Sequence, residues 1–304
     1  MASHTARPDR VHVIGVPFNS AGRSDGVAQA PAALRQAGLL ERLRGVGANV
    51  QDRGDVELPD PTSERDAASH VIGPGAMRSM IEAAGARVAE SLQQGAFPLV
   101  LGGDCPILIG CLAAAKQTGP SIGLLFVDGH EDAWPPEHSP SGEAADMELG
   151  FILGLHRDRL PASVSESVPQ LDFDVVAVLG PRDQQELRAA GVPSLEGQLA
   201  AYHSSEVVAA DPGALVADAA KRLARAGAWW LHVDLDVLST ESLAAVDYRQ
   251  PGGLNWDALS SLTAAALRSP GIIGWDITIY NPDLDDGGTG ASRIVRYVGD
   301  AFTP

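Results

Sequence analysis

The chain alternates short apolar segments with helical patterns, and this alternation limits its fold more than any other feature. Near-continuous apolar runs predict buried strands at residues 11–18, 97–101, 122–127, 175–179, 229–233 and 272–275. Apolar side chains at helical spacing predict helices over residues 30–43, 76–92, 214–226 and 256–268. Buried strands separated by helices are typical of a parallel sheet covered on both faces. We therefore expect an α/β fold with a central, mostly parallel sheet.

Nothing in the sequence divides the chain into parts. Its 304 residues contain no internal repeat, low-complexity tract or linker. The most loop-like stretches are residues 59–69, 133–143 and 239–253. We expect one domain spanning residues 1–304, although the length alone would allow two.

Charge and composition exclude several classes of function. Acidic residues outnumber basic ones by 39 to 22, for a net charge of −17. This balance argues against nucleic-acid and anionic-membrane partners, which need clustered lysine and arginine. Apolar runs stay far below the roughly 20 residues that span a bilayer. The two cysteines, Cys105 and Cys111, form no disulfide framework, and residues 1–7 lack an apolar leader, so we expect a cytoplasmic protein.

Ligand-type side chains follow two of the predicted strands. They are Asp128, His130 and Asp132 after one strand, and Asp234 and Asp236 after the other. Alternate residues of an extended segment share a face, and ligands of parallel sheets bind beyond the carboxyl ends of the strands. The carboxylates would repel each other without a cation, and two divalent ions would remove that repulsion. This donor set suits Mn²⁺ best, with iron, cobalt, nickel and zinc as alternatives. The competing interpretation is a set of ordinary acidic turn residues.

Four segments resemble the arginase/agmatinase (ureohydrolase) superfamily. Residues 15–18 with 30–40 resemble its opening strand and first helix, and residues 98–104 resemble its Gly-Gly-Asp-His segment. Residues 128–132 resemble its Asp-Ala-His-x-Asp segment, and residues 232–236 its Ser-x-Asp-x-Asp segment. The resemblance covers nearly the whole chain. It implies a three-layer α/β/α sandwich, a binuclear metal centre, hydrolysis of a guanidino C–N bond, and a homo-oligomer, either a trimer or a hexamer.

The resemblance also implies a role for each ligand-type residue. Asp128 and Asp234 would bridge two metal ions. Asp132 would complete the first site, and His130 with Asp236 the second. A hydroxide between the ions would attack the planar carbon of the substrate, and Asp132 would orient it and receive its proton.

Two departures from the family pattern put the usual substrates in doubt. Cys105 stands where the family has a metal-ligand histidine. A thiolate can still bind a metal, with a shift of preference toward iron, cobalt, zinc or nickel, and the alternative is a buried thiol without a ligand role. Ile279 corresponds to the glutamate that holds the guanidinium. Either the substrate is less cationic, or Asp247 or Glu143 replaces the missing carboxylate.

The loop after the Asp128 segment resembles the arginase loop that holds a substrate carboxylate. Ser141 matches that loop, whereas Ala145 stands where a proton-shuttling histidine would be. His138 is a candidate shuttle, and a solvated loop histidine is the equal alternative. Arg182 is expected either to bind a substrate carboxylate or to cap its own strand–helix turn.

These patterns predict a metal-dependent hydrolase that acts on linear amidines. The expected substrate is a non-standard guanidino-like small molecule, such as an N-hydroxyguanidine, an amidine or a modified guanidino acid. One alternative is a conventional guanidino-acid or agmatine hydrolase with a rebuilt clamp. Another is a catalytically silent family member that serves as a binding or regulatory subunit.

Overall fold

The computed structural model describes residue 8 and residues 10–119 and 121–303. The segment 1–7, on which the expectation of no secretory leader rests, lies outside the described residues. Within the described part, the helices are all too short or too polar to cross a membrane.

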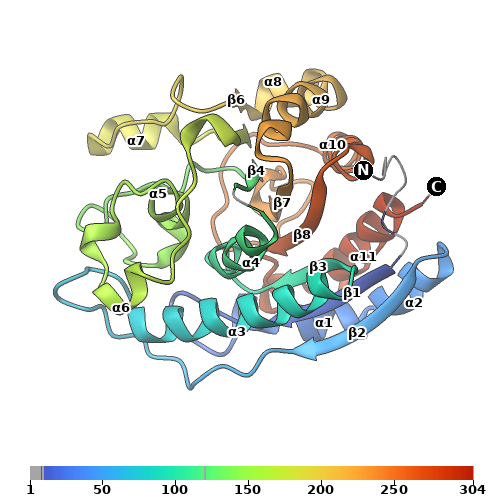
Figure 1. Ribbon diagram of the computed structural model, residues 1–304, viewed down its shortest axis with the longest axis horizontal. Helices are drawn as coiled ribbons and strands as arrows, with labels where there is room; N and C mark the ends of the chain where they lie inside the picture. Colours follow the sequence, from blue (N-terminus) through green and yellow to red (C-terminus); the bar gives the residue numbers. More distant parts are fainter. Residues whose placement is uncertain (1–7, 9, 120, 304) are drawn as a thin grey trace.

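A single eight-stranded parallel sheet runs through the middle of the described chain (Figure 1). The strand order is β2-β1-β3-β8-β7-β4-β5-β6, and every neighbouring pair is parallel. The strands are β1 (Arg10–Val16), β2 (Asn49–Asp55), β3 (Phe97–Gly102), β4 (Gly123–Val127), β5 (Val176–Gly180), β6 (Ala201–Ser204), β7 (Trp229–Asp234) and β8 (Ile272–Thr278). This confirms the parallel sheet expected from the apolar runs.

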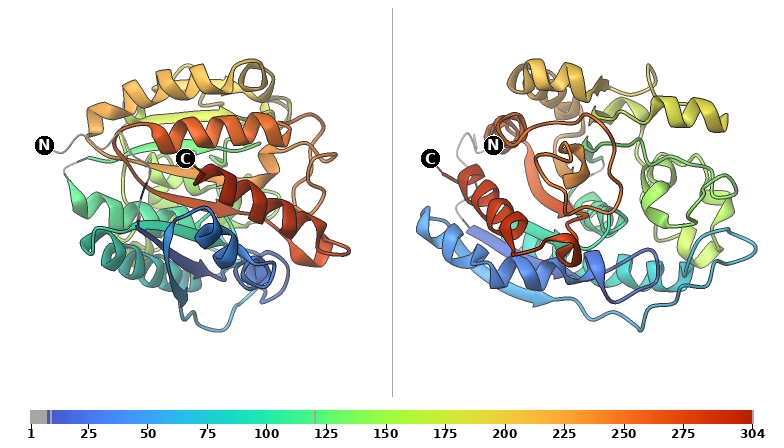
Figure 2. Two further views of the ribbon diagram at one scale, coloured as in Figure 1. Left: turned by 90° about the vertical axis from the view of Figure 1, so that its right-hand side faces the viewer. Right: turned by 180° about the vertical axis from the view of Figure 1, so that it is seen from behind.

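Helices cover both faces of the sheet. They are α1 (Ala30–Gln36), α2 (Leu39–Gly45), α3 (Pro74–Gln93), α4 (Ile107–Ala115), α5 (Glu148–Ile152), α6 (Ala162–Ser165), α7 (Gln184–Ala190), α8 (Ser205–Ala210), α9 (Pro212–Leu223), α10 (Trp256–Arg268) and α11 (Thr289–Ala301). One apolar core packs α1, α2, α9, α10 and α11 against the sheet, and the other packs α3 to α6 against the opposite face. In Figure 1, α3 lies in front, and the rear view in Figure 2 brings α11 forward. The α/β/α sandwich is confirmed.

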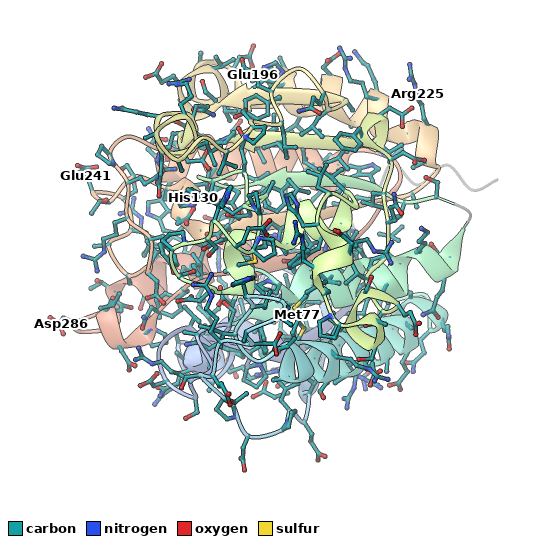
Figure 3. All side chains as sticks on the ribbon, turned by 90° about the vertical axis from the view of Figure 1, so that its left-hand side faces the viewer. Met77, His130, Glu196, Arg225, Glu241 and Asp286 are labelled. Atoms are coloured by element: carbon teal, nitrogen blue, oxygen red, sulfur yellow. The ribbon has the colours of Figure 1, made fainter. Side chains whose placement is uncertain are left out.

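The fold brings the predicted polar segments to one edge of the sheet. Asp128 directly follows β4, and Asp234 ends β7, its hydrogen-bonded neighbour. Cys105 follows β3, and Ile279 follows β8, which lies between β3 and β7. Because parallel strands all end at the same edge, these four residues meet there. Figure 3 shows His130 well inside the molecular outline, whereas Glu196, Arg225 and Asp286 lie at its margin.

Candidate metal centre

Asp128 and Asp234 form the centre of the site, on adjacent strands. One oxygen of Asp128 accepts the backbone N–H of His130 at 2.7 Å, and one oxygen of Asp234 accepts that of Asp236 at the same distance. Each aspartate thus caps its own turn and is held in place by it. The second oxygen of Asp128, Oδ2, is buried without a hydrogen-bond partner. A buried oxygen of this kind is one that a cation would satisfy.

His130 and Asp236 lie beside Asp128. The His130 Nδ1 atom is 3.0 Å from Asp236 Oδ2 and 3.5 Å from Asp128 Oδ1. The backbone N–H of Gly129 donates to the other Asp236 oxygen at 3.1 Å, which fixes that carboxylate. The side chains of Asp128, His130 and Asp236 therefore lie close together.

Cys105 is buried and its thiol donates to the Asp234 carboxylate. The sulfur also lies 3.4 Å from the Thr278 hydroxyl. Burial, followed by the negative charge of Asp234, raises the pKa of the Cys105 thiol well above its usual range. A bound cation acts in the opposite direction, because a thiol that coordinates a metal loses its proton. The ionisation of Cys105 would therefore depend on the metal.

Among the residues that the structure describes, ligand-type atoms gather in three overlapping groups, each with its donor atoms within 4.8 Å of one another. The groups are Cys105, Asp128, His232 and Asp234; Asp128, His130 and Asp236; and Asp128, Asp132 and Glu148. All six ligands predicted from the sequence occur in them. His232 and Glu148 also belong to these groups and are not among the predicted ligands. The sequence does contain a signal for both residues. His232 and Glu148 are each a titratable residue within an apolar stretch, and their neighbours are buried.

Asp132 and Glu148 are two buried carboxylates of these groups with raised pKa values. Asp132 has a φ of 42°, in the left-handed region that non-glycine residues rarely adopt. Neither oxygen of the buried Glu148 has a hydrogen-bond partner. Burial, and after it the charge of Asp128, raises the pKa of both carboxyls well above the usual range. Orphaned, repelling carboxylates are what divalent ions would stabilise, so the donor set fits such ions.

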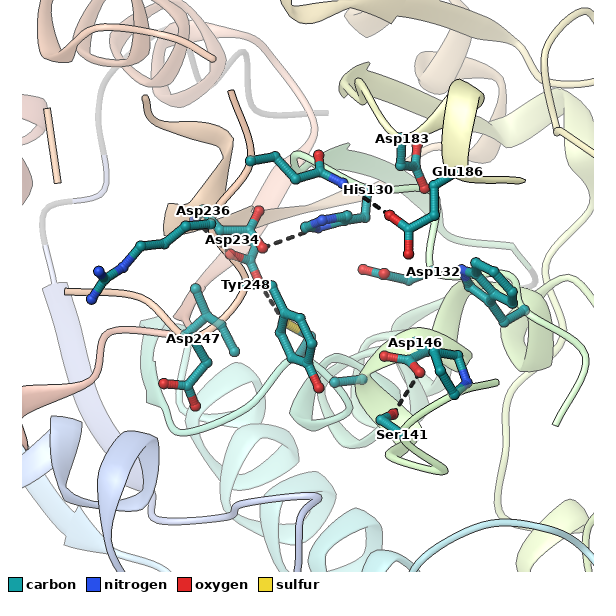
Figure 4. A pocket seen from close by; sticks show the side chains of 17 residues that line it. His130, Asp132, Ser141, Asp146, Asp183, Glu186, Asp234, Asp236, Asp247 and Tyr248 are labelled. Carbon is teal, nitrogen blue, oxygen red and sulfur yellow. Dashed lines mark hydrogen bonds and ion pairs between the residues drawn. The ribbon is translucent and has the colours of Figure 1, made fainter. Parts of the chain in front are cut away.

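A cavity opens onto these groups, and its wall is strongly acidic (Figure 4). Its lining includes Asp132, Asp146, Asp183, Glu186 and Asp247, together with Trp134 and Tyr248. In Figure 4, Asp183 and Glu186 lie on one side of the cavity and Asp247 on the opposite side. Glu186 is not among the predicted residues, because it is an exposed residue of the short helix α7 and no motif marks it. Arg249 also lines the cavity, but the acidic side chains outnumber it, so the wall favours a molecule with at least one positive group.

The structure places three of the expected substrate residues in the cavity wall. They are Ser141, Asp247 and Ile279. Glu143 is not among the lining residues, but its backbone N–H donates to Ser141 Oγ at 2.9 Å, and burial raises its pKa to about 7. Arg182 is also outside the lining and donates to the Asp236 carbonyl at 2.7 Å. His138 is exposed in a turn away from the wall.

The family model described as the Arginase family matches residues 9–302. The chain belongs to the arginase family. Arginase from Bacillus caldovelox is 30% identical over 96% of this chain and 97% of that protein. Arginase from Brevibacillus brevis is 31% identical, over 56% of this chain and 57% of its own length.

Solved structures agree with this assignment. Native arginase from Bacillus caldovelox superposes with a TM-score of 0.83 at 26% identity, over 97% of this chain and 99% of that one. Proclavaminate amidino hydrolase from Streptomyces clavuligerus superposes with a TM-score of 0.64 at 19% identity, over 98% and 92%, and shows the shared fold alone. Family membership supports a metal-dependent hydrolase of guanidino C–N bonds in general, and the arginase family uses a binuclear divalent metal centre.

Within this arginase-family site, Ile279 has an unusual conformation. Its φ is 66°, which is rare for a β-branched residue, and its side chain is only 2% exposed. Its backbone N–H donates to the Gly103 carbonyl at 2.8 Å, so β3 and β8 jointly hold it. A strained backbone at a cavity wall must be maintained by its surroundings. The surrounding structure therefore fixes Ile279 in this conformation, and its apolar side chain lines the cavity.

Proposed function

We propose that the protein is a two-metal hydrolase of a guanidino-like small molecule whose reacting group is neutral when bound. The observation that carries this proposal is Ile279 in the cavity wall. A guanidinium keeps its full charge at neutral pH, and burying an unpaired charge costs several kcal/mol. An N-hydroxyguanidine, or an amidine or modified guanidino acid whose substituents lower its pKa, avoids this cost.

The three donor groups supply the ligands for the metal ions. The two ions would be held by Asp128 and Asp234, together with Cys105, Asp132, His130 and Asp236. When bound, divalent ions make water a strong nucleophile near neutral pH and polarise the group under attack. Manganese is the family's common choice, and the thiol favours iron, cobalt, zinc or nickel.

The protein's own groups would position the substrate and handle its protons. Asp132 faces both the donor groups and the cavity, so its carboxylate can hold a water molecule and receive a proton from it. Asp183 and Glu186 line the wall away from Asp247 and would bind a positive amine at the far end of the substrate. The reacting group would then lie against Ile279.

One observation favours a second candidate. Asp247 lines the same cavity as Ile279, and its carboxylate accepts a hydrogen bond from Asn281. A carboxylate held in this way would pair with a guanidinium. The alternative is therefore a conventional guanidino-acid or agmatine hydrolase in which Asp247 or Glu143 replaces the missing clamp. A silent binding subunit is disfavoured, because an unused site has no reason to retain so many repelling buried carboxylates.

A substrate panel with three variants separates these candidates. The panel contains arginine, agmatine, N-hydroxyarginine and simple amidines, and the measurement is kcat/KM on the metal-loaded protein. We expect poor turnover of arginine, agmatine and the strongly basic simple amidines, better turnover of the less basic N-hydroxyarginine, and improved arginine turnover in Ile279→Glu. Asp247→Asn and Glu143→Gln should change little. Efficient arginine hydrolysis that falls at least tenfold in Asp247→Asn would favour the rebuilt clamp. Efficient arginine hydrolysis that neither Asp247→Asn nor Glu143→Gln reduces would contradict both the neutral-substrate proposal and the rebuilt clamp.

We also propose a single domain, a cytoplasmic location and assembly into a trimer or hexamer. Family membership supports the oligomer, because arginase-family proteins often assemble. Sedimentation of the purified protein would measure its size.

A further inference from the structure

His232 is a fully buried histidine in the central part of the sheet, close to the candidate metal centre. It precedes Asp234 by two residues on β7, so the two side chains point to the same face. Its ring stacks on Phe126 of the neighbouring strand β4, with the ring centroids 4.7 Å apart. Phe126 in turn precedes Asp128 by two residues. The imidazole thus sits one layer below the two central aspartates.

A carboxylate fixes the orientation of this imidazole. The Nδ1 atom of His232 lies 2.6 Å from Asp276 Oδ2 on β8. The other oxygen of Asp276 accepts the indole N–H of Trp230 at 2.5 Å, so the carboxylate is itself held. A carboxylate at Nδ1 keeps the proton there and leaves the lone pair of Nε2 available. Histidines that bind metal ions in proteins are oriented in this way.

The Nε2 atom of His232 faces another atom without a partner. Nε2 is buried and makes no hydrogen bond, and the same is true of Asp128 Oδ2, which lies 3.8 Å away. This distance is too long for a hydrogen bond. It lies within the roughly 3 to 4 Å that separates two donor atoms bound to one ion. One cation between them would satisfy both atoms, which are otherwise buried without a partner.

His12 shows that an unpaired nitrogen is not enough by itself. It is also fully buried, its Nδ1 lies 3.0 Å from Ser91 Oγ, and its Nε2 has no partner. Among the described residues, however, His12 belongs to none of the three donor groups. His232 differs because a thiol and two carboxylates surround its free nitrogen.

The two departures from the family segments complement each other. Cys105 stands where the Gly-Gly-Asp-His segment has histidine, and His232 stands where the Ser-x-Asp-x-Asp segment has serine. Both side chains belong to the same donor group. We propose that His232 binds, through Nε2, the metal ion that Cys105 faces, so that β7 supplies the imidazole missing at position 105. This inference rests on the metal centre of the proposed function.

The proposal has a consequence for metal preference. The ion beside Cys105 would have a thiolate and an imidazole among its ligands, together with carboxylates. The second group, with Asp128, His130 and Asp236, contains one imidazole and otherwise oxygen ligands. Sulfur and nitrogen donors favour zinc, cobalt or iron over manganese, so the two sites should differ in preference.

Cobalt provides a test on the full chain. The protein is stripped of metal, loaded with Co²⁺ and dialysed, and its cobalt content and X-ray absorption spectrum are measured. We expect two ions per chain with, on average, one imidazole per ion, from His130 and His232. His232→Asn keeps a polar group toward Asp276 but lacks Nε2, so it should bind one ion firmly and the other at least about 100-fold more weakly. The matched control, His12→Asn, should retain both ions.

A restoring double variant completes the test. Cys105→His combined with His232→Ser places the donors as in the family segments and should bind two ions without sulfur scattering. Two firmly bound ions in His232→Asn, or only one imidazole per two ions in the unaltered protein, would overturn the inference and leave the metal centre standing. Failure of the unaltered protein to bind cobalt, zinc or manganese would overturn both proposals. The spectrum of the unaltered protein decides the matter even if a variant does not fold.

Discussion

Cys105 and Cys111 are both buried thiols, but their surroundings give them different roles. Cys105 contacts the carboxylate of Asp234 at the candidate metal centre, whereas Cys111 lies within the apolar side of α4. Burial is the largest cause of the raised pKa of both thiols, so neither is a free thiolate without a nearby cation. Only the thiol of Cys105 lies in a donor group that would provide one.

Removing the thiol of Cys105 should therefore change metal content, and removing that of Cys111 should not. We expect Cys105→Ala to retain one of two ions, because the ion beside it loses a ligand. Cys105→His should keep both ions and shift preference toward Mn²⁺. Cys111→Ala, the control, should keep both ions and lose about 1–2 kcal/mol of stability. The measurement is metal content after reconstitution and dialysis, and an unchanged content in Cys105→Ala would make Cys105 a core thiol.

The carboxylate and histidine metal ligands predicted from the sequence share one property, which is their place at or just after the end of an apolar strand. This place predicts Asp128, His130 and Asp234 as ligands, because ligands bind beyond the carboxyl ends of the strands in a parallel sheet. His232 and Glu148 could not be found by that rule. His232 lies within its strand, and Glu148 begins a helix that follows a long loop. Only the three-dimensional arrangement brings their free polar atoms toward Asp128.

Among the elements, the interior strands were predictable and the edge strands were not. β1, β3, β4, β5, β7 and β8 are apolar runs because neighbouring strands and helices bury them. β2 and β6 are the two edges, with partly or fully exposed side chains, so they carry no such run. The helix expected over residues 30–43 is divided into α1 and α2 by Gly38, whose φ is 91°.

Gly103 shows how closely the end of β3 packs against its neighbours. A Cβ atom there would lie 1.9 Å from the backbone oxygen of Phe18. The carbonyl of Gly103 also holds the N–H of Ile279. The glycine therefore sets the positions of both the following Cys105 and the strained Ile279.

We expect Gly103→Ala to destabilise the protein by about 3 kcal/mol and to weaken metal binding. The backbone of residues 16–18 must move, and overpacking of this kind costs roughly 1–3 kcal/mol or more. Gly45→Ala is the control, because Gly45 ends α2 and nothing lies within 4 Å of its added Cβ. That variant should be neutral or slightly more stable. Denaturant unfolding measures the free energy of unfolding of both variants. A Gly103→Ala variant as stable as Gly45→Ala would show that residues 16–18 move without an energetic cost.

At the scale of the whole molecule, a chain with a net charge of −17 buries many of its acidic groups at one place. Burial is the main cause that raises the pKa of Asp104 and Asp183 to about 6 and that of Glu143 to about 7. Their ordinary values are 3.8 for aspartate and 4.5 for glutamate. Between about pH 4 and pH 7, the folded chain therefore holds protons that the unfolded chain has released.

The stability of the metal-free protein should consequently fall as the pH rises. The sign follows from linkage, because a state that holds more protons loses stability when protons become scarce. We expect a lower melting temperature at pH 8 than at pH 5 in the presence of a chelator. Glu143→Gln should reduce this difference, since it removes one carboxyl with a raised pKa. Added divalent metal should raise the melting temperature at both pH values and more at pH 8, because its ligands bind in their deprotonated forms. Scanning calorimetry with and without metal measures all four conditions. A metal-free melting temperature that is higher at pH 8, with equal increments from metal at both values, would show that the buried carboxylates do not govern the stability of this molecule.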